Sequence, residues 1–229
     1  MSRTNTYIIT NDGERVDFTL DVSDRKRWAL AAQEGRLIVR VSRGYNAARV
    51  REFIESNLGW IHSAIDRTAE KSGLPQKYED GEVIRLLGER LTVSFVNSDR
   101  YFKPEISEGK LLVSVCPQSD KAYAAGEIGR FIFSLAEKEV RESMDRLTKI
   151  TGLVPKKVTL KSMTASWGRC SSDGNISINY KVVTYSKRHI DYVCIHELAH
   201  LKYMNHSGEF WALVEKYCPD WREIRKSMR

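Results

Sequence analysis

The sequence predicts an α+β fold, in which a β-rich N-terminal region of duplicated hairpin-plus-helix units precedes a region organised around one helix with paired histidines. Three observations predict it. Residues 15–42 resemble residues 90–116, an apolar stripe at helical spacing follows each copy, and from residue 158 short strand-like runs lead into a helix containing the pattern H-E-x-x-H. We place the boundary at residue 120, which gives domains 1–120 and 121–229.

The two similar segments share an order of features. Each runs from an alternating strand through Ser-Asp-Arg to Glu-Gly, and then to Leu-x-Val-x-Val. Glu34-Gly35 and Glu108-Gly109 each separate two strand-like runs, where a tight turn needs a residue that tolerates positive φ. Each copy therefore predicts a β-hairpin.

Helical patterns follow both copies. Apolar residues recur at spacings of three, four and seven over residues 50–65 and again over residues 128–147. The second pattern predicts a long helix that links the two regions. Between the helices, residues 83–95 predict a further hairpin around Gly88-Glu89.

The last third of the chain predicts short strands and then helices. Residues 158–161 form one strand, Asp173-Gly174 is a strong turn dipeptide, and residues 176–182 alternate as a half-buried strand does. Ser186 can cap a helix that begins near Arg188 and runs to about Met204.

That helix contains His196-Glu197-Leu198-Ala199-His200. Residues four apart lie on one helical face, so both imidazoles can bind the same metal ion. Glu197 is turned about 100° from His196 around the helix, and so lies beside the ion, suited to accept a proton from a metal-activated water.

A third histidine, His206, follows ten residues after His196 and becomes a ligand only if the helix ends and the chain reverses. We expect Asn205 to end the helix in the left-handed conformation and Ser207 to cap the next one. Three histidines with an open fourth position are typical of catalytic zinc sites. We therefore predict one catalytic zinc ion on His196, His200 and His206, with another divalent metal as the alternative, and Glu197 as the catalytic carboxylate.

The two other histidines lack this spacing. His62 lies in the first helical pattern, and His189 follows Lys187 and Arg188 at the start of the motif helix. We expect both to be solvated surface groups.

Composition limits the class of protein. With 41% hydrophobic and 29% charged residues among 229, the chain is globular rather than disordered or fibrous. It has no apolar run of membrane-spanning length and no signal-peptide pattern at its start, so we expect a cytoplasmic protein without a membrane partner. Four widely separated cysteines favour reduced thiols over a disulfide framework. A formal charge of +7 is modest for this length and compatible with solubility alone.

Several motifs together resemble one family. The run Trp167-Gly168-Arg169-Cys170, the H-E-x-x-H helix and Asn205-His206-Ser207 are similar to the YgjP-like metal-dependent hydrolases, a zincin-like family related to the SprT-like and WLM metallopeptidases. The resemblance covers most of the chain and is most specific in the last third. It implies a zincin-like metallopeptidase domain, zinc on the three histidines, Glu197 as the catalytic residue, and a peptide or protein substrate.

The resemblance also bears on substrate binding. At the position of Arg169 the family pattern has serine; Arg169 either stabilises an anionic group at the metal or is a solvent-facing arginine. In zincins the substrate commonly lies as an added strand, and residues 175–183 are the expected edge, with Ser177 and Asn179 facing the cleft. A second oxygen-stabilising group is expected near the zinc, and the candidates are Tyr180, Tyr185, Tyr203 and Arg169.

Two alternatives stay open. A metal-activated water also suits a non-peptide anionic substrate such as a nucleotide phosphoanhydride. The chain is alternatively a DNA-associated protease, in which basic residues contact phosphate, although a solvated basic face is the ordinary explanation. The residues concerned are Lys156, Lys157, Lys161, Arg222, Arg225, Lys226 and Arg229.

Overall fold

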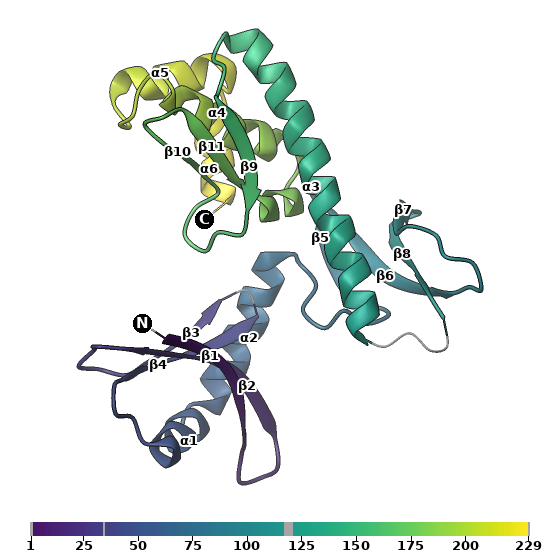
Figure 1. The fold of residues 1–229 in the computed structure, drawn as a ribbon, viewed down its shortest axis with the longest axis vertical. Helices are drawn as coiled ribbons and strands as arrows, with labels where there is room; N and C mark the ends of the chain where they lie inside the picture. The colour runs from purple at the N-terminus through teal and green to yellow at the C-terminus, as the bar shows by residue number, and fades with distance from the viewer. Residues whose placement is uncertain (1, 34, 117–120, 229) are drawn as a thin grey trace. The chain divides into compact units, whose positions relative to one another are not determined.

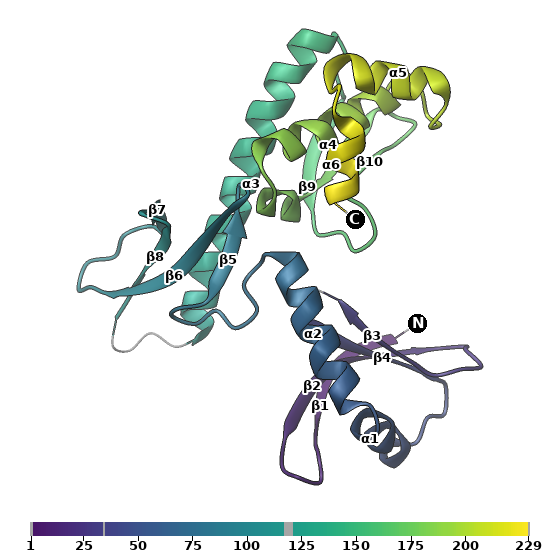
Figure 2. The ribbon, with the colours of Figure 1, turned by 180° about the vertical axis from the view of Figure 1, so that it is seen from behind.

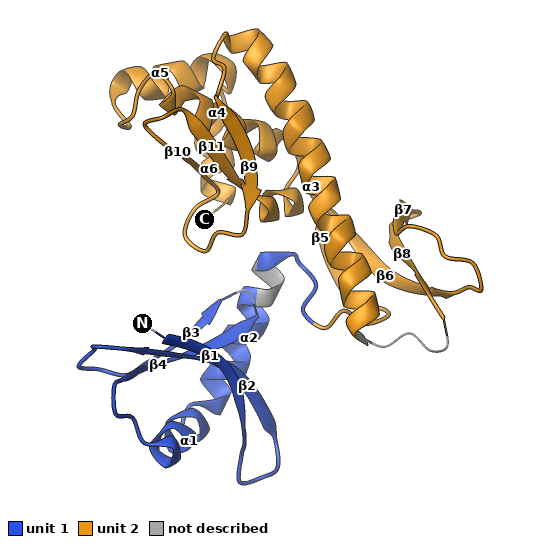
Figure 3. Ribbon diagram, viewed as in Figure 1, with its two compact units in different colours: residues 1–76 blue, residues 77–229 orange. Residues whose placement is uncertain are grey.

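The chain packs as two compact units, Met1–Gln76 and Lys77–Arg229 (Figure 3). The structure is a computed structural model that describes residues 2–33, 35–116 and 121–228. Some parts of the chain discussed above lie outside these ranges, namely Glu34, Arg229 and the segment 117–120, which holds the expected boundary. The division into domains 1–120 and 121–229 stays a prediction, while the packing of the chain groups residues 77–116 with the C-terminal part.

Unit 1 is one sheet with helices on one face (Figure 1). Its core joins the alternating residues Val16, Phe18 and Leu20 of the second strand to Ile54 and Ile61 of the helices, all of them buried. The strands are β1 (Ser2–Ile9), β2 (Arg15–Ser23), β3 (Ala29–Gln33) and β4 (Arg36–Ser42), in the order β1-β2-β4-β3, followed by α1 (Ala47–Glu55) and α2 (Leu58–Ser72). Among the described strands of this sheet, β2 and β4 pair in parallel and the other neighbours pair antiparallel.

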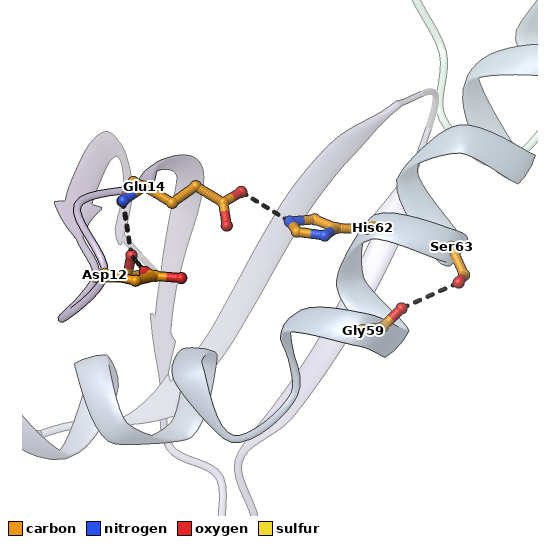
Figure 4. Close-up of polar contacts among 6 residues, drawn as sticks. Asp12, Glu14, Gly59, His62 and Ser63 are labelled. Atoms are coloured by element: carbon orange, nitrogen blue, oxygen red, sulfur yellow. Dashed lines mark hydrogen bonds and ion pairs between the residues drawn. The ribbon is translucent and has the colours of Figure 1, made fainter.

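His62 ties the first hairpin of unit 1 to a helix. Its Nε2 lies 2.8 Å from Oε1 of Glu14, which follows the β1–β2 turn (Figure 4). The neighbouring turn residue Asn11 donates its backbone and side-chain N–H groups to Glu55, at 2.9 and 3.1 Å. His62 is exposed, as expected for a surface group, but the sequence spacing gave no sign of this partner 48 residues away.

Unit 2 begins with a second sheet of the same topology. Its strands are β5 (Val83–Leu86), β6 (Glu89–Asn97), β7 (Glu105–Ser107) and β8 (Lys110–Val115), in the order β5-β6-β8-β7, and β6 and β8 run parallel. The expected turn residues Glu108 and Gly109 both have positive φ, 49° and 74°. The two sheets confirm the duplication.

Each copy contains more than the hairpin that the sequence predicted. The hairpins β3–β4 and β7–β8 form as expected, but the preceding strand of each copy pairs in parallel with the second hairpin strand. The helices that follow the two copies differ from each other. After the first copy, α1 ends at Glu55 before α2 begins, whereas the second copy is followed by one long helix, α3 (Lys121–Thr151).

The C-terminal part of unit 2 contains a third sheet, which has three strands and again combines one parallel pair with an antiparallel hairpin. Its strands are β9 (Lys157–Lys161), β10 (Gly168–Cys170) and β11 (Asn175–Asn179), in the order β10-β11-β9. After it come a 3-10 helix, η1 (Tyr180–Thr184), and three helices, α4 (Lys187–His200), α5 (Gly208–Tyr217) and α6 (Trp221–Ser227). Helices α4 and α6 lie on the same side of this sheet, as Figures 1 and 2 show from opposite directions.

Two expectations for this region were wrong. The strand predicted over residues 175–183 ends at Asn179, whose side-chain oxygen accepts from the N–H of Lys181 and starts η1. This strand is also the middle one of its sheet, so it offers no free edge. The free edges belong to β10 and β9.

The core of unit 2 fixes the motif helix from behind. Ile190, Cys194 and Leu198 of α4 are each at most 1% exposed and pack in one cluster with residues of α3. The β5–β6 turn joins it as well, because Leu87 packs against this cluster and donates its N–H to the carbonyl of Val183 at 2.7 Å. Among the described residues no helix has the length and apolar character to cross a membrane.

Candidate metal centre

Helices α4 and α5 bring three histidines together. His196 and His200 lie one turn apart on α4, and His206 precedes α5. One ring nitrogen from each lies within 4.8 Å of the other two, and the Nε2 atoms of His196 and His206 are 3.1 Å apart. The predicted grouping of the three side chains is therefore present in the fold.

The reversal that returns His206 begins earlier than expected. Helix α4 ends at His200 rather than near Met204, and the N–H groups of Lys202 and Tyr203 donate back to the carbonyl of Ala199. Asn205 is not among the residues with positive φ, so its predicted left-handed conformation is wrong. Ser207 caps α5 as predicted, accepting from the N–H of Phe210.

A hydrogen bond orients the ring of His200. Its Nδ1 lies 3.0 Å from the carbonyl oxygen of Tyr203. Because a carbonyl oxygen only accepts, Nδ1 must carry the proton, and Nε2 keeps the lone pair that a metal ion needs. Ending α4 at His200 is what places this carbonyl beside the ring.

The protonation states of the clustered histidines also suit the binding of a metal cation. Burial, followed by the neighbouring His200 and His206 and the charge of Arg225, lowers the pKa of His196 to about 3. Burial likewise lowers the pKa of His206. Both imidazoles are thus neutral at pH 7, with lone pairs available for coordination.

The geometry and the packing fit a divalent metal. Two imidazoles bound tetrahedrally to one zinc ion have nitrogens about 3.3 Å apart, which follows from zinc–nitrogen bonds of about 2.0–2.1 Å. The 3.1 Å spacing of His196 and His206 matches that value. Phe210, which is fully buried, has its ring centre within 4.9 Å of all three imidazoles and limits their movement.

Glu197 is buried beside the cluster. It is 4% exposed, its Oε2 atom has no hydrogen-bond partner among the described residues, and burial raises its pKa to about 8. A buried carboxyl oxygen without a partner is costly, and such groups are kept where they serve a function.

Gly168 on β10 makes room for this carboxyl group. A Cβ atom at that position would lie 2.5 Å from Oε1 and 2.6 Å from Cγ of Glu197, closer than any side chain allows. Any larger residue here would therefore force the Glu197 side chain or β10 to shift. The sequence gave a signal, since glycine in a strand often marks a close approach by another group, but no partner could be named from it.

Arg169 and Asn179 lie away from the histidines. Gly168 faces Glu197, so the next residue of the strand, Arg169, points to the opposite side of the sheet, where it is exposed. Asn179 is 3% exposed and donates its side-chain N–H groups to the carbonyls of Met163 and Ser166. Its amide holds the loop before β10 rather than facing a cleft.

The remaining candidates have other contacts. Tyr180 packs against Phe133, Tyr185 packs against Trp167, and Tyr203 supplies its carbonyl to His200. His189 bridges two helices, with Nδ1 2.7 Å from Oγ of Ser186 and Nε2 2.9 Å from Oγ of Ser227. We had expected His189 to be a solvated surface group, and the structure shows instead that both of its ring nitrogens contact serine hydroxyl groups.

The family follows from comparison with known proteins. The YgjP-like metallopeptidase domain matches residues 26–229. The chain belongs to the YgjP-like family. This YgjP-like protein is accordingly a metal-dependent hydrolase with a three-histidine metal site, and its family is one of peptidases.

Among solved structures, the YgjP-like chain is similar to the metallopeptidase zymogen of Pyrococcus abyssi abylysin. The two are 31% identical, the match covers 38% of this chain and 89% of the other, and the TM-score is 0.36. No curated protein shows significant similarity to the chain.

Proposed function

We propose that this YgjP-like chain is a zinc peptidase in which His196, His200 and His206 hold one zinc ion and Glu197 acts as general base. The observation that carries the proposal is the juxtaposition of three converging imidazoles with a buried carboxyl group, whose Oε2 has no hydrogen-bond partner within residues 2–33, 35–116 and 121–228. A zinc ion bound there supplies a Lewis acid, which lowers the pKa of water and polarises a carbonyl group.

Glu197 moves the proton in this scheme. Its carboxylate accepts a proton from the attacking water and delivers it to the nitrogen of the leaving amine. Burial holds the pKa of Glu197 near 8 in the metal-free protein, which is close to the range where a group both takes and gives a proton at neutral pH. Gly168 leaves the space in which this carboxyl group lies.

Strand β10 is the proposed binding edge for the substrate backbone. The N–H of Asn179 donates to Trp167, and that of Ser171 donates to Asn175, so alternate residues of this segment pair inward with β11. In an antiparallel ladder the intervening residues, Gly168 and Cys170, direct their N–H and C=O groups to the free edge. An extended peptide that added there as a strand would pass beside Glu197.

The ligand assignment is tested by removing each histidine. His196→Ala, His200→Ala and His206→Ala should each lose tightly bound zinc and the cleavage of an unfolded protein substrate, whereas His62→Ala, in unit 1, should keep both. Zinc content and cleavage are measured on the same samples, with a panel of nucleotides assayed in parallel. Zinc binding unchanged in all three variants would overturn the assignment, and metal-dependent nucleotide hydrolysis without peptide cleavage would overturn the substrate class.

A second candidate function, action on proteins bound to DNA, rests on the other face of the third sheet. Lys157, Lys161 and Arg169 are exposed there, and the strands β9, β10 and β11 contain no acidic residue. Phosphate contacts make binding strongly salt-dependent. Duplex DNA should then bind more weakly as salt rises, and Lys157→Gln/Lys161→Gln should flatten that slope; no binding at low salt would remove this candidate.

A further inference from the structure

Arg225, on α6, is connected to the metal centre through a single aromatic ring, that of Trp211. Its guanidinium carbon is 5.1 Å from the centre of the Trp211 ring. That ring is in turn 5.5 Å from the ring of His206, at an interplanar angle of 23°, and 5.7 Å from the ring of His196. Trp211 therefore links the guanidinium group to two of the three imidazoles.

Through Trp211, α6 brings a cation to the side of the site where His206 and His196 lie. Arg169, the arginine that the sequence suggested for this position, points to the opposite side of its sheet. The cation beside the histidines thus comes from α6.

The guanidinium group of Arg225 is also available to bind a ligand. It has no hydrogen bond or ion pair with any residue in the part of the chain that the structure describes, and it is exposed. By contrast Arg222, on the same helix, stacks on Trp221 at 4.6 Å but is paired with Glu215. A guanidinium group over an aromatic ring keeps its N–H donors in its own plane, where they can meet both oxygens of a carboxylate.

We propose that Arg225 is a specificity-determining residue that binds a carboxylate of the substrate close to the bond being cleaved. This inference rests on the proposed function, because it places the substrate at the three histidines. The carboxylate belongs either to an acidic side chain or to the C-terminus of a short peptide. Trp211 holds the guanidinium group in place, so little side-chain entropy is lost on binding.

Peptide binding tests the proposal without turnover. Three otherwise identical octapeptides are titrated into the zinc-loaded, full-length Glu197→Gln protein: one neutral and amidated, one amidated with a central Gln→Glu change, and one neutral but with a free C-terminus. Adding Arg225→Gln should weaken binding of a carboxylate peptide about tenfold, as expected for a charge-assisted hydrogen-bonded pair, and leave the neutral peptide unchanged. The carboxylate peptide that responds identifies the source.

Two controls separate this role from a structural one. Arg222→Gln, in the same background, should change none of the three affinities. Arg225→Lys keeps the charge but loses the planar fork, so it should recover only part of the preference. Equal weakening of all three peptides by Arg225→Gln, or no weakening of any, would overturn the proposal.

The failure of this inference and the failure of the proposed function give different results. If the zinc-loaded wild type cleaves no peptide while the carboxylate preference depends on Arg225, the proposed function fails and only the carboxylate-binding role of Arg225 is retained. If the wild type cleaves peptides and Arg225→Gln cleaves acidic and neutral ones in the same ratio, the inference fails and the proposed function stands.

Discussion

Substituting Gly168 by alanine should impair Glu197 as a general base and leave the three histidine ligands in place. The added Cβ would lie 2.6 Å from Cγ of Glu197, whereas carbon atoms pack at about 3.5 Å. Either the glutamate side chain or β10 must therefore shift by about 0.9 Å, the difference between these values. Misplacing a catalytic group by about 1 Å can lower the rate on the order of a hundredfold.

The assay compares turnover, zinc content and stability of Gly168→Ala with those of the wild type. We expect kcat to fall on the order of a hundredfold, with zinc content unchanged, and the free energy of unfolding to fall by about 1–3 kcal/mol from overpacking. Gly208→Ala is the matched control, since Gly208 also flanks the metal centre but a Cβ there has no neighbour within 4 Å.

A thermodynamic cycle identifies the clash itself. In a Glu197→Ala background the contact partner is absent, so Gly168→Ala should cost much less stability than it does in the wild type. Undiminished turnover in Gly168→Ala would refute the view that Gly168 positions Glu197. An equal stability loss in both backgrounds would show that the alanine clashes with something else.

Three further predictions concern the metal, pH and a loop. Removing the metal with a chelator should lower the melting temperature of the protein, and adding zinc should restore it, because free zinc at 1,000 times Kd adds about 4 kcal/mol of stability. Thermal scans without and with zinc measure this difference, and equal melting temperatures would contradict zinc binding. In the metal-free protein the pKa of Glu197, about 8, exceeds its ordinary 4.5. The unfolded chain therefore ionises first at this position, and the contribution of Glu197 to stability declines from about pH 4.5 to 8 by up to about 1.4 kcal/mol per pH unit. His196 contributes with the opposite sign below its ordinary pKa of 6.5, because burial lowers its pKa in the folded protein to about 3, so the net decline is expected above pH 6.5. Denaturant titrations of Glu197→Gln should show a shallower decline, and an unchanged slope would count against the burial argument. Asn179→Ala should cost about 1–3 kcal/mol, because the carbonyls of Met163 and Ser166 lose their donor; a negligible change in urea unfolding would argue against this role.

The parts of the site that the sequence predicted depend on local spacing. His196 and His200 share a face because they are four residues apart, and Ser207 marks the start of the next helix through its own capping side chain. The duplicated sheets were also visible, since both copies repeat the same turn residues.

The parts that the sequence missed depend on contacts between distant segments. Nothing in residues 175–179 indicates that their strand is central rather than at the edge, because strand order is set by pairing across the sheet. The close approach of Gly168 to Glu197, and the stacking of Arg225 on Trp211, likewise arise only when separate elements pack together. Pattern and spacing carry no information on which side chains meet in this way.

In the proposed mechanism the three histidines would hold a zinc ion that could activate water, and Glu197 would carry the proton. This mechanism is tested most directly by measuring turnover per bound zinc in wild type and Glu197→Gln, each reconstituted with zinc. We expect one zinc per chain in both proteins, and turnover in the variant lower on the order of a hundredfold or more, the usual contribution of a general base. Wild-type turnover per zinc in Glu197→Gln would contradict it.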